Sequence, residues 1–183
     1  MYIFRRRRSG QKCKENCDAY KAAFSAAEKL HERCNELSIE ATQFHSLLSV
    51  NDKGNIILGI SSVNNHLVAT TICDAWGQWR TVSLYLLQDR KYDRPICNMD
   101  VSYTSDYRKA HIEDWHCEYE NMGYGSVLMT HLINYLKVAG FFYLTGEICP
   151  VDFNHESKLR HFYTKFGFKI TDFPDRRVIK LKL

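Results

Sequence analysis

The chain has 183 residues, 45% of them hydrophobic, and a formal net charge of +4. This size favours a single globular domain over residues 1–183, and no run of about 18 apolar residues could span a membrane. The start lacks the apolar stretch of a signal peptide, and the mild, dispersed charge does not favour a nucleic-acid partner, so we expect a cytoplasmic protein that is a monomer or a homodimer.

The first half of the chain predicts helices followed by an antiparallel meander. Asn64-Asn65 and Trp76-Gly77 separate three of the expected strands and suit hairpin turns. In chain order, the expected elements are a possible strand at Tyr2 to Arg6, helices at Cys13 to Leu37 and Ala41 to Leu48, and strands at Ile56 to Ser61, Leu67 to Asp74 and Arg80 to Leu87. Residues 88–110 form a long polar connection with a possible further strand at Ile96 to Ser102.

Seven cysteines, an odd number, in a chain without an expected secretory signal predict reduced, intracellular thiols. Four residues near the start could suggest zinc: Cys13, Cys17, His31 and Cys34. If residues 13–37 form one helix, the two halves of this set lie about 20 Å apart at the helical rise and cannot share a metal ion. We therefore expect no metal.

The second half of the chain predicts a strand, helix, strand, helix run. A strand at His111 to Cys117 leads into a glycine turn, and apolar side chains then recur at helical spacing from Tyr124 to Ala139. Gly140 ends that helix. The remaining expected elements are a buried strand at Phe141 to Cys149, a helix at His155 to Phe166 and an alternating strand at Val178 to Leu183.

Gly123 and Gly125 are therefore expected at a helix N-terminus. Such a turn lets the backbone approach a ligand while unpaired N–H groups and the positive end of the helix dipole face it, which suits a phosphate group. Two glycines before a helix more often indicate only a tight turn, so this element alone is weak evidence.

Two motifs together are more specific. Gly123 to Met129 reads Gly-Tyr-Gly-Ser-Val-Leu-Met, and Phe162 to Phe168 reads Phe-Tyr-Thr-Lys-Phe-Gly-Phe. In order and spacing these resemble the cofactor loop and the following helix of the GCN5-related N-acetyltransferase (GNAT) superfamily. The resemblance covers residues 50–183 and is close over residues 111–170.

The resemblance implies an α/β fold with a mixed, mostly antiparallel sheet flanked by helices. The sheet should splay between the strands at His111 to Cys117 and Phe142 to Ile148, where acetyl-CoA binds. It also implies transfer of acetyl to a primary amine, by direct transfer in a ternary complex. Cofactor contacts are then expected from Cys117, Met122, Gly123, Tyr124, Gly125, Ser126 and Asn154.

Two positions depart from the family pattern. Glu120 stands where the loop usually has Gln or Arg, and a carboxylate that faces a pyrophosphate is repulsive unless it turns away. Glu156 occupies the position where an Asn is usual, with Asn154 two residues earlier.

The resemblance also assigns catalytic roles. Tyr163 corresponds to the tyrosine whose hydroxyl protonates the departing thiolate, the alternative being a core tyrosine. Glu113 is the nearest match to the general base. Its rivals are Asp114, His116 and Glu118, and the alternative is an ordinary polar strand face.

Other residues near the expected site have more than one interpretation. Asp152 and His155 could orient substrate, although we favour a helix cap for Asp152. Cys149 and Cys117 are treated as packing residues. Acidic side chains around the site indicate a cationic acceptor, either a small amine or a lysine side chain. The competing hypotheses are a noncatalytic module of this fold that binds CoA, RNA or protein, and an acyltransferase with another acyl donor.

Overall fold

The computed structural model describes residues 21, 23–43, 55–76, 78–87, 94–106 and 108–183. The chain divides into two compact units, Met1–Thr42 and Gln43–Leu183, which are described separately. Within the described residues, no helix is long and apolar enough to cross a membrane.

The described part of the first unit is one helix. Residues 23–43 are helical without a break, so the predicted end at Leu37 and new start at Ala41 are wrong. The intervening Ser38, Ile39 and Glu40 include neither Gly nor Pro, and nothing in them interrupts a helix. The expected strand at Tyr2 to Arg6, Cys13, Cys17 and the segment 44–48 lie outside the described residues.

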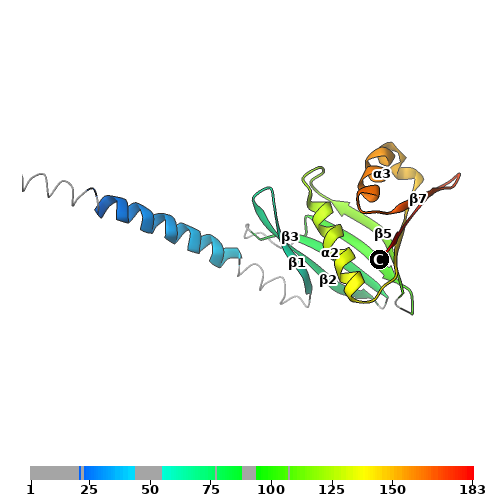
Figure 1. The fold of residues 1–183 in the computed structure, drawn as a ribbon, viewed down its shortest axis with the longest axis horizontal. Helices are drawn as coiled ribbons and strands as arrows, with labels where there is room; N and C mark the ends of the chain where they lie inside the picture. Colours follow the sequence, from blue (N-terminus) through cyan, green and yellow to red (C-terminus); the bar gives the residue numbers. More distant parts are fainter. Residues whose placement is uncertain (1–20, 22, 44–54, 77, 88–93, 107) are drawn as a thin grey trace, which may run out of the picture. The chain divides into compact units, whose positions relative to one another are not determined.

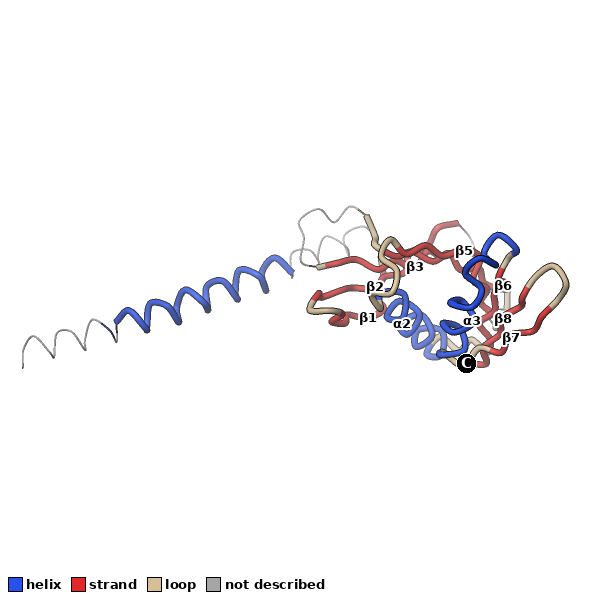
Figure 2. Tube along the Cα trace, turned by 90° about the horizontal axis from the view of Figure 1, so that it is seen from above, coloured by secondary structure: helices blue, strands red, loops and turns tan. Residues whose placement is uncertain are grey.

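The second unit is built on an eight-stranded sheet with the order β1-β2-β3-β4-β5-β6-β8-β7. All neighbouring strands are antiparallel except β5 and β6. The sheet is mixed and mostly antiparallel, as predicted, and Figure 2 shows it curving around α2, with α3 beside β6, β8 and β7. The strands are β1 (Ile56–Val63), β2 (His66–Trp76), β3 (Trp79–Leu86), β4 (Cys97–Tyr103), β5 (Lys109–Cys117), β6 (Tyr143–Ile148), β7 (Lys169–Asp172) and β8 (Arg177–Lys182), and the helices are α2 (Tyr124–Val138), η1 (Pro150–His155) and α3 (Glu156–Lys165).

The expected meander is present. Asn64 and Asn65 have φ values of 49° and 65°, the left-handed conformation that a two-residue hairpin turn between twisted strands requires. β2 and β3 form the next hairpin, with Trp76 opposite Trp79. β7 was not predicted from the sequence, because its four residues contain one apolar side chain, Ile170, and its conformation is specified by pairing with β8.

The core lies between the sheet and α2, which crosses β1 to β5 (Figure 1). The helix has the predicted amphipathic pattern, and its buried residues are Tyr124, Leu128, Met129, Leu132, Ile133 and Leu136. They pack on strand residues such as Val82, Met99 and Ile112. Burying each large apolar side chain contributes roughly 1.5–3 kcal/mol to folding.

His131 is the polar exception on the buried face of α2. Its Nδ1 lies 2.8 Å from Thr70 Oγ1 and its Nε2 lies 3.0 Å from Ser61 Oγ. A neutral ring with one donor and one acceptor satisfies both hydroxyls. The ring also needs Gly59, because a Cβ there would lie 2.8 Å from Nε2. Burial lowers the pKa of His131 below its ordinary 6.5.

Stability should therefore fall as the pH drops below 6.5. The unfolded chain protonates His131 at a higher pH than the folded one does, so it binds more protons in this window and is favoured there. Urea unfolding should show a lower midpoint at pH 5.5 than at pH 7.5, with a smaller difference in His131→Gln. Asp106 and Glu156 also have lowered pKa values, but these carboxyls change protonation below pH 4.5 and do not contribute to a difference between pH 5.5 and pH 7.5. An equal pH difference in the variant would contradict the assignment.

Candidate active site

The site begins where two parallel strands separate. β5 and β6 pair only from Lys109–Tyr143 to Ile112–Gly146, and beyond this point β5 continues with β4 while β6 continues with β8. The register of β5 also shifts here: Asp114 pairs with Asp100 but Ile112 with Val101, so Glu113 is an inserted bulge residue. The predicted splay is therefore present, and among the described residues no strand pairs with the β6 side of the last part of β5.

The glycine turn lies just beyond this splay, at the start of α2. Gly123 has a φ of +83°, and its carbonyl accepts hydrogen bonds from the backbone N–H of Ser126 (3.1 Å) and Val127 (3.2 Å). No side chain in the described part of the chain caps the helix, and its first turn contains no acidic residue. Its N-terminal dipole is therefore not offset locally and favours an anion.

Gly125 allows the start of α2 to pack closely against Trp115 of β5. A Cβ at this position would lie 2.7 Å from the Trp115 ring, which belongs to the splayed end of β5. The Trp115 ring in turn packs on Phe162 of α3, with 4.8 Å between centroids. The two aromatic rings thus join β5, the glycine turn and α3.

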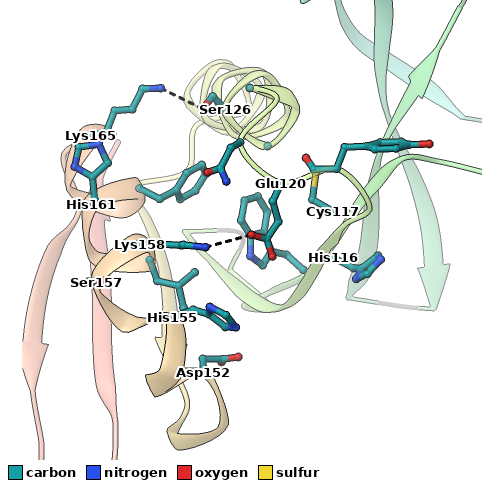
Figure 3. A pocket seen from close by; sticks show the side chains of 17 residues that line it. His116, Cys117, Glu120, Ser126, Asp152, His155, Ser157, Lys158, His161 and Lys165 are labelled. Carbon is teal, nitrogen blue, oxygen red and sulfur yellow. Dashed lines mark hydrogen bonds and ion pairs between the residues drawn. The ribbon is translucent and has the colours of Figure 1, made fainter.

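A cavity of about 790 Å³ opens between the glycine turn and α3 (Figure 3). It is lined by residues of β5, the loop after it, the first turn of α2, η1 and α3. They are Trp115, His116, Cys117, Tyr119, Glu120, Asn121, Gly123, Gly125, Ser126, Asp152, His155, Ser157, Lys158, Leu159, His161, Phe162 and Lys165.

Two contacts join α3 to the glycine turn across this cavity. Lys158 Nζ lies 3.4 Å from Glu120 Oε2, and Lys165 Nζ donates a hydrogen bond of 3.1 Å to Ser126 Oγ (Figure 3). The Glu120 carboxylate is therefore directed toward a cation on α3.

α3 is held in place from its other face. Glu156 Oε1 accepts hydrogen bonds from Arg160 Nε (2.7 Å) and Arg177 Nε (3.0 Å), and both arginines also pair with Asp172. The hydrogen bond from Arg160 is the main cause that lowers the pKa of Glu156. Glu156, at the position where the resemblance expects an Asn, thus anchors α3 to β7 and β8.

A model of the acetyltransferase (GNAT) family matches residues 24–168. The chain belongs to the GNAT family. The matched range includes most of the described N-terminal helix as well as β1 to β6, α2, η1 and α3. A curated relative, the uncharacterized protein YocC of Bacillus subtilis (strain 168), is 27% identical over 145 residues, which cover 78% of this chain and 85% of the relative.

Three solved structures are similar to parts of the chain. An acetyltransferase from Thermus thermophilus is 17% identical and covers 58% of this chain and 65% of its own, with a TM-score of 0.47. PaiA N-acetyltransferase from Thermoplasma acidophilum, in complex with coenzyme A, is 16% identical, with coverages of 58% and 62% and a TM-score of 0.47. A GNAT family acetyltransferase from Elizabethkingia anophelis with acetyl-CoA bound is 19% identical, with coverages of 58% and 77% and a TM-score of 0.45.

Four of the expected cofactor residues of this GNAT chain line the cavity: Cys117, Gly123, Gly125 and Ser126. The other three do not. Tyr124 is 3% exposed and packs in the core, so only its backbone faces the turn. Met122 is exposed, and its carbonyl accepts a hydrogen bond from Asn64 Nδ2, while Asn154 is an exposed residue of η1.

Cys117 corrects the expectation of reduced thiols. It lies directly opposite Cys97 in the β4–β5 register, and the two form a disulfide. The sequence could not show this, because the two cysteines are 20 residues apart and become neighbours only through strand pairing. Among the described residues, Cys34, Cys73 and Cys149 are free, and no group of three or more His, Cys, Asp or Glu could hold a metal ion.

Tyr163 is 4% exposed and lies on the core side of α3, with its ring packed edge-on against Phe168 and Phe162. Burial is the main cause that raises its pKa above the ordinary 10.0, and the Asp152 carboxylate raises it further. The hydroxyl therefore stays protonated at neutral pH. Tyr163 does not line the cavity described above, and its catalytic role stays a prediction.

Glu113 is exposed at the bulge, and its Oε1 accepts a 2.6 Å hydrogen bond from Ser102 Oγ on β4. It lies outside the cavity lining, and its role as base is likewise still a prediction. Of its rivals, His116 lines the cavity, Asp114 accepts the backbone N–H of Trp115 at 2.8 Å, and Glu118 is exposed.

The expected helix cap at Asp152 is wrong. Cys149 and His155 occupy the N-cap positions of η1 and α3, and neither helix start is capped by a side chain of the described residues. Asp152 lies within η1 and instead lines the cavity beside His155. Lys158, His161 and Lys165 also line the cavity and were not predicted as site residues, although their spacing of three and four residues on a predicted helix places them on one face.

Proposed function

We propose that the protein is an N-acetyltransferase that moves acetyl from acetyl-CoA to a primary amine in a ternary complex. The observation that carries this proposal is that β5 and β6 diverge beside the start of α2, which no described side chain caps. The end of β5 and the start of α2 line the same cavity. The divergence frees backbone groups of β5 that can hydrogen-bond the amides of a pantetheine arm. The first turn of α2 can receive the pyrophosphate.

The chemistry requires a base, an electrophile held in place and a donor to the leaving group. Glu113 removes a proton from the acceptor ammonium, directly or through water, so that the amine can attack the thioester carbon. The C–N bond forms and the C–S bond breaks. The Tyr163 hydroxyl donates its proton to the departing thiolate. The attacking nitrogen then loses its second proton, which passes through water to the Tyr163 phenolate, so that the amide and free CoA are released.

The acceptor is proposed to be cationic. Asp152 lines the cavity, Glu113 and Asp114 lie on β5 past the splay, and Glu118 directly follows β5. These carboxylates attract an amine in its protonated form. A small amine and a lysine side chain both meet this requirement.

Calorimetric titration of the protein with acetyl-CoA, compared with free CoA, tests the proposal. We expect micromolar binding, followed by amine-dependent release of free thiol when candidate amines are added. A protein that binds acetyl-CoA without releasing thiol in the presence of any amine would be a noncatalytic module. No detectable binding would overturn the transferase proposal.

A further inference from the structure

One face of α3 is cationic where it borders the cavity. Lys158, His161 and Lys165 follow at i, i+3 and i+7, and all three line the cavity opposite the glycine turn. Figure 3 shows their side chains on the α3 side, with those of Glu120 and Ser126 across from the two lysines. α3 thus presents two ammonium groups toward the start of α2.

The loop across the cavity from α3 carries a negative charge at Glu120. Glu120 stands where a cation or an amide is expected in the GNAT loop, and it pairs with Lys158. The cation next to the glycine turn therefore comes from α3, 38 residues later in the chain. Lys165 reinforces this arrangement, because its hydrogen bond to Ser126 holds the ammonium at the first turn of α2, where the positive end of the helix dipole also attracts an anion.

The Glu120–Lys158 pair is exposed and easily broken. The Lys158 and Glu120 side chains are 60% and 68% exposed, and the N–O distance of 3.4 Å is long for a charge-assisted hydrogen bond. Exposed pairs of this kind add little stability. A phosphate group has more charge and more acceptor oxygens than a carboxylate. It can therefore replace Glu120 as the partner of Lys158 at little cost in free energy.

We propose that Lys158 and Lys165 bind the phosphate groups of the acyl-CoA substrate, and that Glu120 is an exchangeable counter-ion that holds Lys158 at the cavity until phosphate replaces it. This inference rests on the proposed function and assigns the charged half of its binding site. Substrate binding breaks the Glu120–Lys158 pair and leaves the Glu120 carboxylate in solvent.

Calorimetry with acetyl-CoA on single variants tests the lysines. Lys158→Ala and Lys165→Ala should each weaken binding by about tenfold, the value of one charge-assisted contact. Lys137→Ala, which removes one charge from the far end of α2, is the matched control and should bind like the wild type. The loss should shrink at high salt. Titration with acetyl-pantetheine, which has no phosphate, should not distinguish the lysine variants from the wild type.

Glu120→Gln tests the counter-ion. It should tighten binding by roughly two- to fivefold in the wild-type background, the value of an exposed ion pair, and by less in Lys158→Ala, where no pair exists. An equal gain in both backgrounds, or no gain, would overturn the counter-ion role. Lysine variants that bind like Lys137→Ala would overturn the phosphate contacts alone, whereas a wild type without acetyl-CoA affinity would overturn the proposed function with them.

Discussion

Tyr163→Phe should lower kcat by about a hundredfold or more while leaving acetyl-CoA affinity nearly unchanged. A positioned proton donor contributes roughly 10²–10⁴-fold to such reactions, and only the transition state develops charge on sulfur. The substitution removes one oxygen from a side chain that is 4% exposed and keeps its ring contacts with Phe168 and Phe162. Its effect should therefore be chemical rather than structural.

Steady-state kinetics with the best amine, together with calorimetry, separate these effects. Tyr85→Phe is the control, because Tyr85 is also buried but belongs to β3 and lies outside the cavity lining. It should retain wild-type kcat. A Tyr163→Phe protein with unchanged kcat and intact acetyl-CoA binding would show that Tyr163 is a core residue only.

Gly125→Ala should weaken acetyl-CoA binding by about tenfold or more. The new methyl would lie 2.7 Å from the Trp115 ring, so the ring must move away from Gly125, which disturbs its packing on Phe162, and both rings line the cavity. Overpacking of this kind costs about 1–3 kcal/mol, partly offset by up to about 1 kcal/mol of helix propensity. The GNAT loop pattern accepts Ala here, so the restriction comes from Trp115.

Two further variants identify the cause. Gly59→Ala makes a similar clash, 2.8 Å from the His131 ring, and should lose comparable stability without loss of acetyl-CoA affinity. Trp115→Phe removes the ring atoms that a methyl at Gly125 would meet, so it should restore binding to Gly125→Ala. Equal affinities in Gly125→Ala and the wild type would show that the cofactor does not approach this turn.

Local patterns in the chain predicted most of the fold. The 3.6-residue period from Tyr124 onward, the paired asparagines at the first hairpin and the alternation in β8 each act over a few neighbouring residues. Because these patterns involve only near neighbours, they also account for the two elements that were predicted wrongly or not at all. The N-terminal helix continues past Leu37 because no local breaker is present, and β7 is too short to show a period of its own.

The glycine turn of the site was also predictable, because its function lies in backbone conformation that Gly123 and Gly125 specify locally. The charge pairing and the cysteine redox state at the cavity were not predictable from the sequence. Glu120 reads as repulsive in the sequence and becomes a partner of Lys158 only when α3 packs opposite the loop. Cys97 and Cys117 meet only through the β4–β5 register, and Trp115 restricts Gly125 only because β5 leaves β6 at the bulge. Helices and turns follow from interactions between near neighbours, whereas these contacts join residues 10 to 38 positions apart and exist only once the sheet and helices have assembled.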